Sequence, residues 1–416
     1  MNSGQGWMLA LILLVVALSL FGAVRIDWTD ASAILNYFGR LTGIVGLALL
    51  LLAAALITRV PGFDRHFGGL TKLWNTHHLL GAGSLLLLMA HPLLLALAAT
   101  DVSMSAAIAL LFPEFSNWQI WSGWLALILM MIFLAPSFSF FGRPEYQRWK
   151  YVHRLAGPAV ILALVHAFQY GRTMPAHAER WLWLLLAVLA VGAVLWRFVF
   201  SRRITRHKYQ VEQVVAVANN LVELVLKPQH HHLKYQAGQF VYLTPYDKTL
   251  SAGYGEEHPY TVSSSPDEPV LRIAIKDLGD ASRAIQTIQP GSLVTIEGPY
   301  GDFFPVNGNP KQLWIAGGIG ITPFLGRARH LLRSSKPVDV CLIYCVQDEA
   351  RTRFLDELED IAKQLEGFQV SIHYFYRMGP LDRDFLHQHC SDITDRDVFI
   401  CGPQPLNHLA RRLISS

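Results

Sequence analysis

The first 200 residues of this 416-residue chain consist mainly of long apolar runs with short connections between them. An α-helix of about 20 residues crosses the hydrocarbon core of a bilayer, and it satisfies its own backbone hydrogen bonds there. Six segments are close to that length or longer, namely 7–24, 33–57, 70–98, 118–138, 151–170 and 181–200. The sequence therefore predicts a membrane α-helical bundle of six transmembrane helices.

The charges at the ends of these segments predict their orientation. Basic residues gather between the second and third segments, between the fourth and fifth, and after the sixth, whereas the connection between the third and fourth holds Asp101 and Glu114 and no basic residue. Basic connections face the cytoplasm. The first segment lacks the basic start and small-residue cleavage site of a signal peptide, so we expect a retained helix. We expect a multi-pass protein of the cell (inner) membrane with its second half in the cytoplasm.

After residue 202 the composition becomes that of soluble domains. The four cysteines, Cys341, Cys345, Cys390 and Cys401, all lie in this half and form no CxxC or CxxCH pattern. Neither a zinc ribbon nor covalent haem attachment is therefore indicated, and we expect reduced cytosolic thiols. The net charge of +4 is small, and the basic residues lie mainly at the ends of the apolar segments. Nucleic acid is thus not expected as a partner.

Two of the apolar segments carry a pair of histidines each. His77 and His91 lie near the two ends of the third segment, and His153 and His166 lie near the two ends of the fifth. An imidazole in hydrocarbon needs a partner, and two neutral imidazoles that face each other can be the axial ligands of a haem iron. Because the third and fifth helices run in the same direction, we expect two facing pairs, one near each side of the membrane.

The spacings are those of two stacked haems. The histidines of the third segment are 14 residues apart and those of the fifth are 13 apart, which is roughly 20 Å along the membrane normal at about 1.5 Å per residue. Fourteen residues nearly complete four helical turns, whereas thirteen do not, but the Gly157–Pro158 step can adjust the winding of the fifth helix. Ordinary polar residues of a helix bundle are the alternative, which the matched depths disfavour.

His78 is an alternative to His77 as a ligand. Its spacing of 13 residues to the outer histidine of the same segment is also acceptable. We favour His77 because Gly81 follows it by four residues, as Gly157 follows the inner histidine of the fifth segment. His78 is then the counterpart of Arg154, near the propionates of the inner haem.

The second half begins with strand patterns. Alternating apolar and polar residues in 208–227 and 236–246 predict a small antiparallel β-barrel. Three motifs follow, HPYTVSSSP at 258–266, LRIAIKDLGDAS at 271–282 and GPYGDFF at 298–304.

These motifs contain what a flavin site needs. A flavin needs an aromatic side chain against its ring, a hydroxyl near N5 and donors for its pyrophosphate. Tyr260 and Thr261 can supply the first two. Lys276 and Ser282 can supply the third. Taken singly, each is also an ordinary residue of a strand or turn.

The segment LWIAGGIGITPFLG, residues 313–326, is an apolar strand followed by a glycine-rich turn and a helix start. The backbone N–H groups of such a turn can approach a phosphate closely. Apolar strands then alternate with helical stretches, which predicts a parallel α/β sheet. After the last strand, CGPQPL puts Cys401 and Gly402 on the rim where a nicotinamide would lie. A buried structural cysteine is the alternative for Cys401.

The type of nucleotide is suggested by charges after the strand CLIYC. No acidic residue ends this strand, where a site specific for NADH often binds the ribose hydroxyls. Asp348 and Glu349 come a few residues later. The arginines that could reach a 2′-phosphate are Arg351, Arg353 and Arg377. We favour NADPH over NADH, although surface arginines are often simply solvated.

The order GQF, HPYT, IKDLGDAS, GPYG, AGGIGITPF and CGPQPL resembles that of the ferredoxin–NADP reductase-like module. Fused to six helices with paired histidines, it resembles the ferric reductase/NADPH oxidase superfamily, particularly its short bacterial members. In HPYT, a histidine replaces the usual arginine of the flavin motif, as in oxidase-type members. The resemblance covers nearly the whole chain. It implies FAD, two b-type haems, oxidation of NAD(P)H in the cytosol and one-electron reduction of an external acceptor.

The resemblance also implies domains and sites. The domains would be a transmembrane di-haem domain (1–204), an FAD-binding β-barrel (205–306) and an NAD(P)-binding α/β domain (307–416). The metal ligands would be His77, His91, His153 and His166. The nucleotide sites would use His258, Pro259, Tyr260, Thr261, Lys276 and Ser282 for FAD, and Gly317, Gly318, Gly320, Thr322, Pro323, Arg377, Cys401, Gly402 and Pro403 for NAD(P)H. Hydride transfer would take place beside Thr261 and Cys401.

The chain departs from animal superoxide-producing members at two positions. Those members carry another histidine four residues beyond the outer ligand of the third helix, where this chain has Leu95. They also have an aromatic residue between the haems on the fifth helix, where this chain has Ala159. The pocket for oxygen is therefore less well defined by the resemblance than the fold is.

The acceptor has three candidates. O2, reduced to superoxide, is favoured; a chelate of Fe(III) and a periplasmic or cell-surface redox protein are the alternatives. Short outer connections favour a small acceptor over a docked protein. Polar side chains that could stabilise a forming anion near the outer face are Arg40, Gln169, Tyr170 and Arg172. No EF-hand pattern is present, so control by calcium is not expected.

Overall fold

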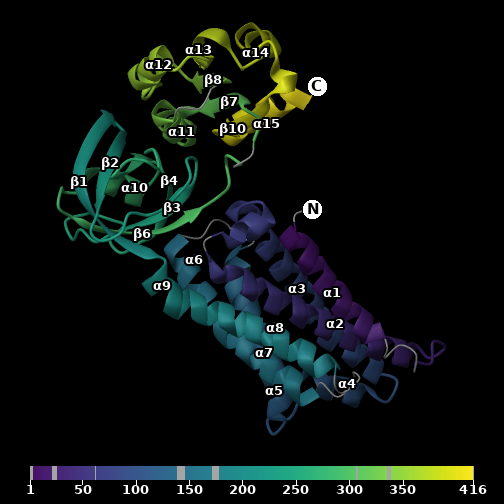
Figure 1. Cartoon of the computed structure of the whole chain (residues 1–416). Coiled ribbons are helices and arrows are strands. Elements are labelled where there is room, and N and C mark those ends of the chain that lie inside the picture. Colours follow the sequence, from purple (N-terminus) through teal and green to yellow (C-terminus); the bar gives the residue numbers. More distant parts are fainter. Residues whose placement is uncertain are drawn as a thin grey trace. The chain divides into compact units, whose positions relative to one another are not determined.

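The structure is a computed structural model that describes residues 3–20, 26–60, 62–137, 146–170, 178–305, 308–334 and 339–415. The chain divides into two compact units, Met1–Arg203 and Ile204–Ser416. The first unit is helical, and the second contains two β-sheets (Figure 1). The predicted boundary between a flavin domain and a nucleotide domain near residue 306 stays a prediction.

Each of the six predicted apolar segments is helical where the structure describes it. The helices of the first unit are α1 (Ser3–Leu20), α2 (Ala31–Ala55), α3 (Leu70–Ala99), α4 (Met104–Leu111), α5 (Trp118–Leu134), α6 (Tyr146–Val152), α7 (Ala156–Tyr170) and α8 (Ala178–Leu195), and α9 (Ser201–Ile204) leads into the second unit. Within the described ranges, four stretches are long and apolar enough to cross a membrane, namely Ala31–Thr58, Leu70–Ala99, Trp118–Ser137 and Arg148–Gln169. Two shorter apolar helices are Ser3–Leu18 and Trp183–Leu195.

The long helices pack in pairs. α2 lies along α3, and α5 lies along α7. The buried hydroxyl of Ser84 on α3 donates to the carbonyl of Gly46 on α2 at 2.7 Å and links the middle of the first pair. Large apolar side chains such as Leu86, Ile161 and Val188 are exposed on the outside of the unit, as expected for helices that face lipid rather than water.

Two features of this unit differ from the predicted helices. The short helix α4 lies in the connection between α3 and α5, where no helix was predicted. The fifth predicted helix begins earlier and is divided into α6, a 3₁₀ turn η6 (His153–Leu155) and α7. The 3₁₀ turn lies just before the Gly157–Pro158 step, where the sequence predicted an adjusted winding. A 3₁₀ turn winds by about 120° per residue instead of about 100°, so it rotates His153 toward the face that carries His166.

The first sheet of the second unit is antiparallel. Its strands are β1 (Arg206–Ala218), β2 (Leu221–Pro228), β3 (Phe240–Pro245), β4 (His258–Thr261), β5 (Leu271–Lys276) and β6 (Leu293–Tyr300), in the order β4-β3-β6-β1-β2-β5. Val262, directly after β4, forms an antiparallel bridge with Ile273 on β5. The apolar side chains of these strands share one buried cluster, to which α10 (Asp280–Ala284) also contributes.

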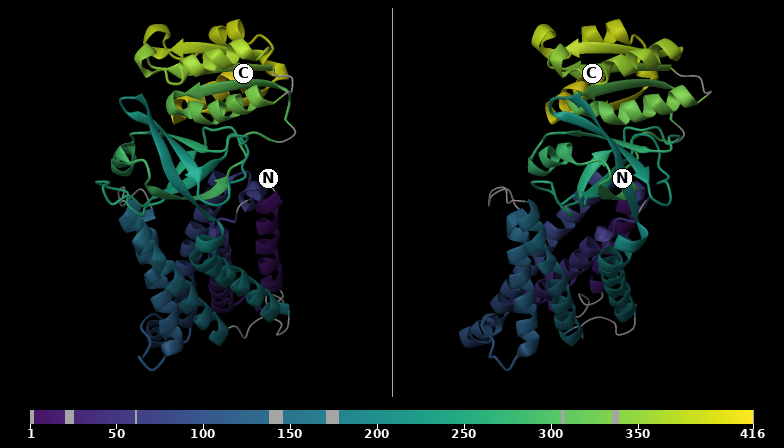
Figure 2. Two further views of the ribbon diagram at one scale, coloured as in Figure 1. Left: turned by 60° about the vertical axis from the view of Figure 1, so that its left-hand side comes forward. Right: turned by 90° about the vertical axis from the view of Figure 1, so that its left-hand side faces the viewer.

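The second sheet is parallel, as predicted from the alternation of strands and helices. Its strands are β7 (Lys311–Gly317), β8 (Asp339–Val346), β9 (Phe368–Tyr374) and β10 (Asp397–Cys401), in the order β10-β7-β8-β9. One apolar cluster packs α11 (Thr322–Arg333) and α12 (Leu355–Gln364) against one face, and a second packs α14 (Arg383–His389) and α15 (Gln404–Ser415) against the other. Figure 2 shows the two sheets of this unit as separate layers. The edge at the carboxyl ends of β7 and β10 is where such a sheet binds a nucleotide.

Candidate functional site

The four predicted histidines of the first unit form two facing pairs. The ring centroids of His77 on α3 and His153 in η6 are 6.3 Å apart, with the planes inclined by 61°. Those of His91 on α3 and His166 on α7 are also 6.3 Å apart, with the planes inclined by 77°. The structure thus brings together residues that are far apart in the sequence, at two levels of one helix bundle.

Two carbonyls of α2 hold the imidazoles of α3. His77 Nδ1 is 2.9 Å from the carbonyl oxygen of Ala53, and His91 Nδ1 is 2.6 Å from that of Gly39. Because a carbonyl oxygen can only accept, Nδ1 carries the proton in both rings and Nε2 keeps its lone pair. This is the tautomer in which Nε2 can bind a metal.

The helix α5 contacts the two remaining imidazoles, those of His153 and His166. His166 Nδ1 donates to the carbonyl of Gln119 at 2.9 Å. His153 Nδ1 is buried and has no hydrogen-bond partner among the described residues, and its ring packs edge-on against the Phe133 ring at 5.1 Å between centroids. At the His91/His166 pair, α5 therefore holds an imidazole as α2 does, whereas at the His77/His153 pair only α2 supplies a carbonyl.

The structure distinguishes His77 from His78. His78 is exposed on α3, and its ring contacts that of His77 at 5.7 Å between centroids. It is His77 whose ring lies opposite His153. One helical turn after each facing histidine, a Cβ built on Gly81 or on Gly157 would meet nothing within 4 Å. Open space therefore borders the His77/His153 pair on both ligand helices.

In the second unit the HPYT motif forms strand β4. Tyr260 pairs with Val241 and Thr261 with Phe240 on β3. Tyr260 packs partly against the apolar interior of the sheet, and burial raises the pKa of its phenol to about 12. His258 lies beside Glu256, with 3.3 Å between Nε2 and the carboxylate oxygen. The motif is thus anchored in the sheet through Tyr260, while Pro259 is exposed.

The two predicted pyrophosphate donors lie at the end of β5 and in the loop after it. Lys276 is the last residue of β5. The Ser282 hydroxyl accepts from the backbone N–H of Leu278 at 2.8 Å and donates to the carbonyl of Gly279 at 3.1 Å. Its first role is therefore to close this loop around the start of α10. The bridge between Val262 and Ile273 brings this motif beside HPYT.

The glycine-rich turn of the nucleotide domain packs directly on the CGP segment. A Cβ on Gly320 would lie 2.2 Å from the carbonyl oxygen of Cys401, and one on Gly317 would lie 2.9 Å from Cδ of Pro403. A Cβ on Gly402 would lie 3.0 Å from the Cα of Gly317. Only glycine fits at these positions, because any side chain would separate β7 from β10. The two predicted NAD(P)H motifs therefore form one surface.

The remaining predicted residues lie around this surface. Gly318 has a positive φ of 54° at the turn, and the buried Tyr344, which the sequence did not single out, donates its hydroxyl to the Gly318 carbonyl at 3.1 Å. Thr322 begins α11 and donates its hydroxyl to the carbonyl of Ile319, with Pro323 in the first turn. Burial raises the pKa of the Cys401 thiol to about 11, so it is protonated at neutral pH.

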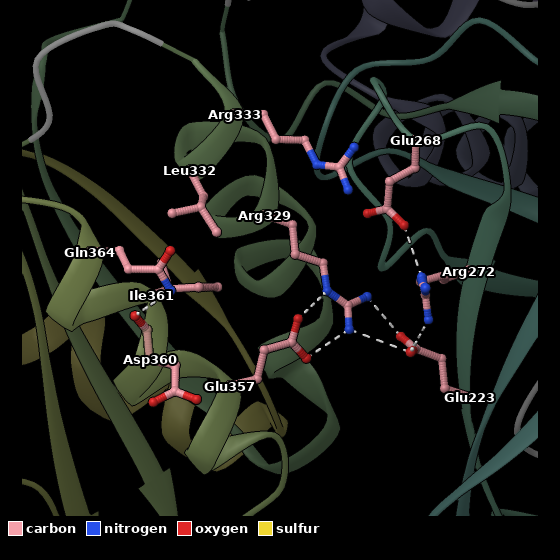
Figure 3. A pocket seen from close by; sticks show the side chains of 10 residues that line it. All are labelled: Glu223, Glu268, Arg272, Arg329, Leu332, Arg333, Glu357, Asp360, Ile361 and Gln364. Carbon is pink, nitrogen blue, oxygen red and sulfur yellow. Dashed lines mark hydrogen bonds and ion pairs between the residues drawn. The ribbon is translucent and has the colours of Figure 1, made fainter.

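A buried ion-pair network joins the two sheets of the second unit, and the sequence did not reveal it (Figure 3). Arg329 on α11 donates to Glu223 on β2 at 2.9 Å, to the Ser263 carbonyl at 2.9 Å and to Glu357 on α12 at 2.6 Å. Glu223 is 3% exposed and Arg329 9%. Burial alone would raise the pKa of Glu223, but the guanidinium of Arg329 lowers it. The only sign in the sequence is a lone carboxylate within the apolar run LVELVL.

Glu223, Arg329 and Glu357 of this network line a cleft between the antiparallel sheet and the helices α11 and α12. Arg272 extends the network, with ion pairs to Glu223 at 3.4 Å and to Glu268 at 2.8 Å. Next to it, a Cβ on Gly326 of α11 would lie 3.0 Å from the Val262 carbonyl oxygen. The helix that begins at the glycine-rich turn therefore packs closely on the backbone just after HPYT.

The predicted arginines lie near the carboxyl end of β9. Arg377 pairs with Glu349 at 3.2 Å and lies 4.7 Å from the ring centroid of Tyr374. Arg351 pairs with Asp348. Arg353 instead donates to the carbonyl of Ala350, at 2.7 Å. Both acidic residues noted in the sequence thus serve as partners of the exposed arginines.

Among the polar residues predicted near the outer face, Arg40 and Gln169 are exposed. Arg172 and the side chain of Tyr170 lie outside the described residues. Arg40 directly follows Gly39, whose carbonyl contacts His91.

Comparison with known proteins finds three domain families along the chain. The ferric reductase like transmembrane component matches residues 42–164, an FAD-binding domain matches 206–303 and an oxidoreductase NAD-binding domain matches 314–412. A superoxide-generating NADPH oxidase heavy chain of Dictyostelium discoideum is 25% identical over 236 residues, which are 50% of this chain and 32% of that protein. An NADPH oxidoreductase of Mycobacterium tuberculosis is 26% identical over 190 residues, 44% of this chain and 49% of that protein.

The chain therefore spans about half or less of the length of these two relatives. Among solved structures, the FAD/NAD-binding domain of nitric oxide dioxygenase from Vibrio cholerae is similar with a TM-score of 0.45 and 22% identity, over 50% of this chain and 92% of that one. The helical unit contains the match to the transmembrane component, and the two sheets contain those to the flavin and nucleotide domains. The chain thus combines matches to a ferric reductase like transmembrane component, an FAD-binding domain and an oxidoreductase NAD-binding domain, and over half of its length it is similar to an NADPH oxidase.

Proposed function

We propose that this oxidoreductase binds two b-type haems at its histidine pairs and carries electrons from cytosolic NAD(P)H to O2 on the outer face of the membrane, producing superoxide. The observation that carries the proposal is the two facing pairs, each with 6.3 Å between ring centroids. When bound, the flavin accepts a hydride and the haems pass on single electrons. Overall, one NAD(P)H and two O2 would give NAD(P)⁺, one proton and two superoxide ions.

The distances within the pairs support haem ligation. A metal–imidazole bond of about 2 Å, with the nitrogen about 1.1 Å from the ring centroid, separates two trans imidazoles by roughly 6 Å, centroid to centroid. Among the described residues, no three His, Cys, Asp or Glu side chains gather as a metal site. Two protein ligands alone hold a metal poorly, whereas a porphyrin supplies the other four. Open space at Gly81 and Gly157 also favours a large group beside His77 and His153.

The proposal includes six transmembrane helices, a closed flavin barrel and a cytoplasmic reductase half. The two shorter apolar helices add to the four stretches that are long enough to span. The bridge between Val262 and Ile273 links the edge strands of the antiparallel sheet. Basic residues in the connections support the orientation, which makes His77 and His153 the inner pair and His91 and His166 the outer pair.

The residues of the reductase half would then orient the nucleotide for hydride transfer. Backbone N–H groups of the turn at Gly318 and the start of α11 would bind phosphate. Cys401, held as a neutral thiol by burial, would lie beside the nicotinamide without adding a charge. The Thr261 hydroxyl on β4 would lie near the flavin.

The choice of O2 as the acceptor rests on the proposal that His91 and His166 are both ligands of the outer haem. With His91 and His166 as its protein ligands, the haem would leave no ligand position for O2 and would supply single electrons. A small molecule can be reduced in a shallow pocket with a nearby donor. The D. discoideum relative is named a superoxide-generating oxidase.

Superoxide production is tested with purified protein, NADPH and cytochrome c. We expect cytochrome c reduction that superoxide dismutase suppresses and that disappears without oxygen. A signal of the same size that dismutase does not affect and that persists anaerobically would contradict the oxidase. Reoxidation of the reduced protein by an Fe(III) chelate, or by a periplasmic redox protein, would then identify the alternative acceptor.

The proposed donor is NADPH in preference to NADH. Replacing Arg377 with alanine is expected to lower the ratio of kcat/KM for NADPH to that for NADH by roughly 10–100-fold, because a charge-assisted hydrogen bond to the 2′-phosphate is lost. Steady-state kinetics with both nucleotides measure this ratio. Arg411→Ala, at an exposed arginine of α15, is the control. An unchanged ratio in Arg377→Ala would exclude Arg377 from recognition of the 2′-phosphate.

A further inference from the structure

Residues 39–43 of α2 (GRLTG) and 119–123 of α5 (QIWSG) contact the His91/His166 pair in the same way. In each, the carbonyl of the first residue accepts the imidazole Nδ1–H, at 2.6 Å on α2 and 2.9 Å on α5. In each, the hydroxyl of the fourth residue donates to that same carbonyl, at 2.8 Å on α2 and 2.7 Å on α5. In each, the fifth residue is glycine.

The glycine makes room for the ring. A Cβ on Gly43 would lie 2.7 Å from Nδ1 of His91, and a Cβ on Gly123 would lie 2.7 Å from Nδ1 of His166. Carbon atoms in van der Waals contact are about 3.5–4 Å apart. Any side chain at either position would therefore push the imidazole away from its carbonyl.

The His77/His153 pair is built without this arrangement. His77 Nδ1 contacts the carbonyl of Ala53 in the last turn of α2, and the His153 ring packs against that of Phe133 in the last turn of α5. After these turns the chain continues as the 3₁₀ turns η2 (Leu56–Thr58) and η4 (Ala135–Ser137). The inner pair thus contacts the ends of two helices, whereas each outer imidazole contacts a carbonyl within a helix, four residues before a glycine.

We propose that Thr42, Gly43, Ser122 and Gly123 are positioning residues that set the reduction potential of the haem held by His91 and His166. The inference rests on the proposed haem binding. A hydrogen bond from Nδ1 makes Nε2 a stronger donor to iron, which stabilises the ferric state and lowers the potential. The glycines permit this bond and so lower the potential.

The hydroxyls act in the opposite direction. A carbonyl oxygen has two lone pairs, which here serve the helical N–H, the hydroxyl and the imidazole. Because the hydroxyls of Thr42 and Ser122 compete for these lone pairs, they weaken the bond to the imidazole. Removing them should lower the potential of the outer haem, whereas adding a Cβ at the glycines should raise it.

The experiment is a redox titration of both haems in the purified full-length holoprotein, with low-spin EPR spectra of the oxidised form. Gly43→Ala and Gly123→Ala are expected to shift the midpoint potential of the outer haem upward and to change its g values. Thr42→Val and Ser122→Ala are expected to shift that potential downward. The inner haem should keep its potential in all four variants.

Gly192→Ala on α8 is the matched control, because a Cβ there would meet nothing within 4 Å. Potentials of the outer haem that equal those of the control in all variants would overturn the inference, and so would shifts of the same sign in both classes. If the glycine variants do not fold, Thr42→Val and Ser122→Ala decide it through the sign of their shift. Wild-type protein without two haems would instead contradict the proposed function on which the inference rests.

Discussion

If the proposed function is correct, replacing His91 or His166 with leucine should remove the outer haem, and replacing His77 or His153 should remove the inner one. In either case the dithionite-reduced spectrum should lose about half of its b-type absorbance, because each site loses one of its two protein ligands. The pyridine haemochrome assay on purified protein measures the haem content per polypeptide.

His78→Leu is the matched control for this prediction. Because His78 is exposed and His77 faces His153, the His78 variant should retain both haems. Full haem content in His166→Leu would refute the assignment of the outer pair. Full content in His77→Leu together with a loss in His78→Leu would move the inner ligand to His78.

The second large effect is expected at Arg329. Its replacement with alanine leaves the carboxylate of Glu223 buried without its main partner, which typically costs about 3–5 kcal/mol. The reductase half should therefore melt roughly 6–20 °C lower, as measured by release of flavin fluorescence. Because α11 links the glycine-rich turn to the backbone after HPYT, anaerobic flavin reduction by NADPH should also slow on the order of 100-fold.

Two comparisons make this prediction specific. Arg283→Ala removes an arginine of similar chemistry that pairs with Asp277 at 2.9 Å but is 73% exposed, so it should leave the melting temperature close to that of the wild type. Glu223→Gln combined with Arg329→Gln should cost less than the sum of the single changes. Wild-type melting and flavin reduction in Arg329→Ala would mean that the network does not hold the two domains together.

The sequence predicted the helical character of the first unit, because long apolar runs have few alternatives, and four of the six predicted spans are long and apolar enough to cross a membrane within the described ranges. It missed α4, whose eight residues are too short for a clear period. The start of α4 was nevertheless marked by Ser103, whose hydroxyl accepts from the backbone N–H of Ala106. The irregular winding before Gly157 was predicted near its true place, because proline cannot continue the hydrogen bonds of a regular helix.

The two facing histidine pairs were predicted from their matched depths in two helices. In the reductase half, the candidate site was predictable only where its residues are neighbours in the sequence or share a motif. The glycine-rich turn and CGPQPL each have their own pattern, and the parallel pairing of β7 with β10 brings them together. The pairing of Glu223 with Arg329 spans 106 residues, and no local pattern specifies it. Ser282 looked like a phosphate donor by its type, but its hydroxyl bonds within its own loop.

The helical unit includes two hairpins, α2 with α3 and α5 with α7, and each hairpin, with the η6 turn that precedes α7, contributes one imidazole to each histidine pair. If the proposed function is correct, each haem would therefore connect the α2/α3 hairpin to the α5/α7 hairpin. Each hairpin can enter the membrane with its own hydrogen bonds complete, but only the metal joins α3 to α7 by a bond. The supply of haem would then control the assembly of this unit. Cells starved of haem should accumulate inserted chains in which no metal connects α3 to α7.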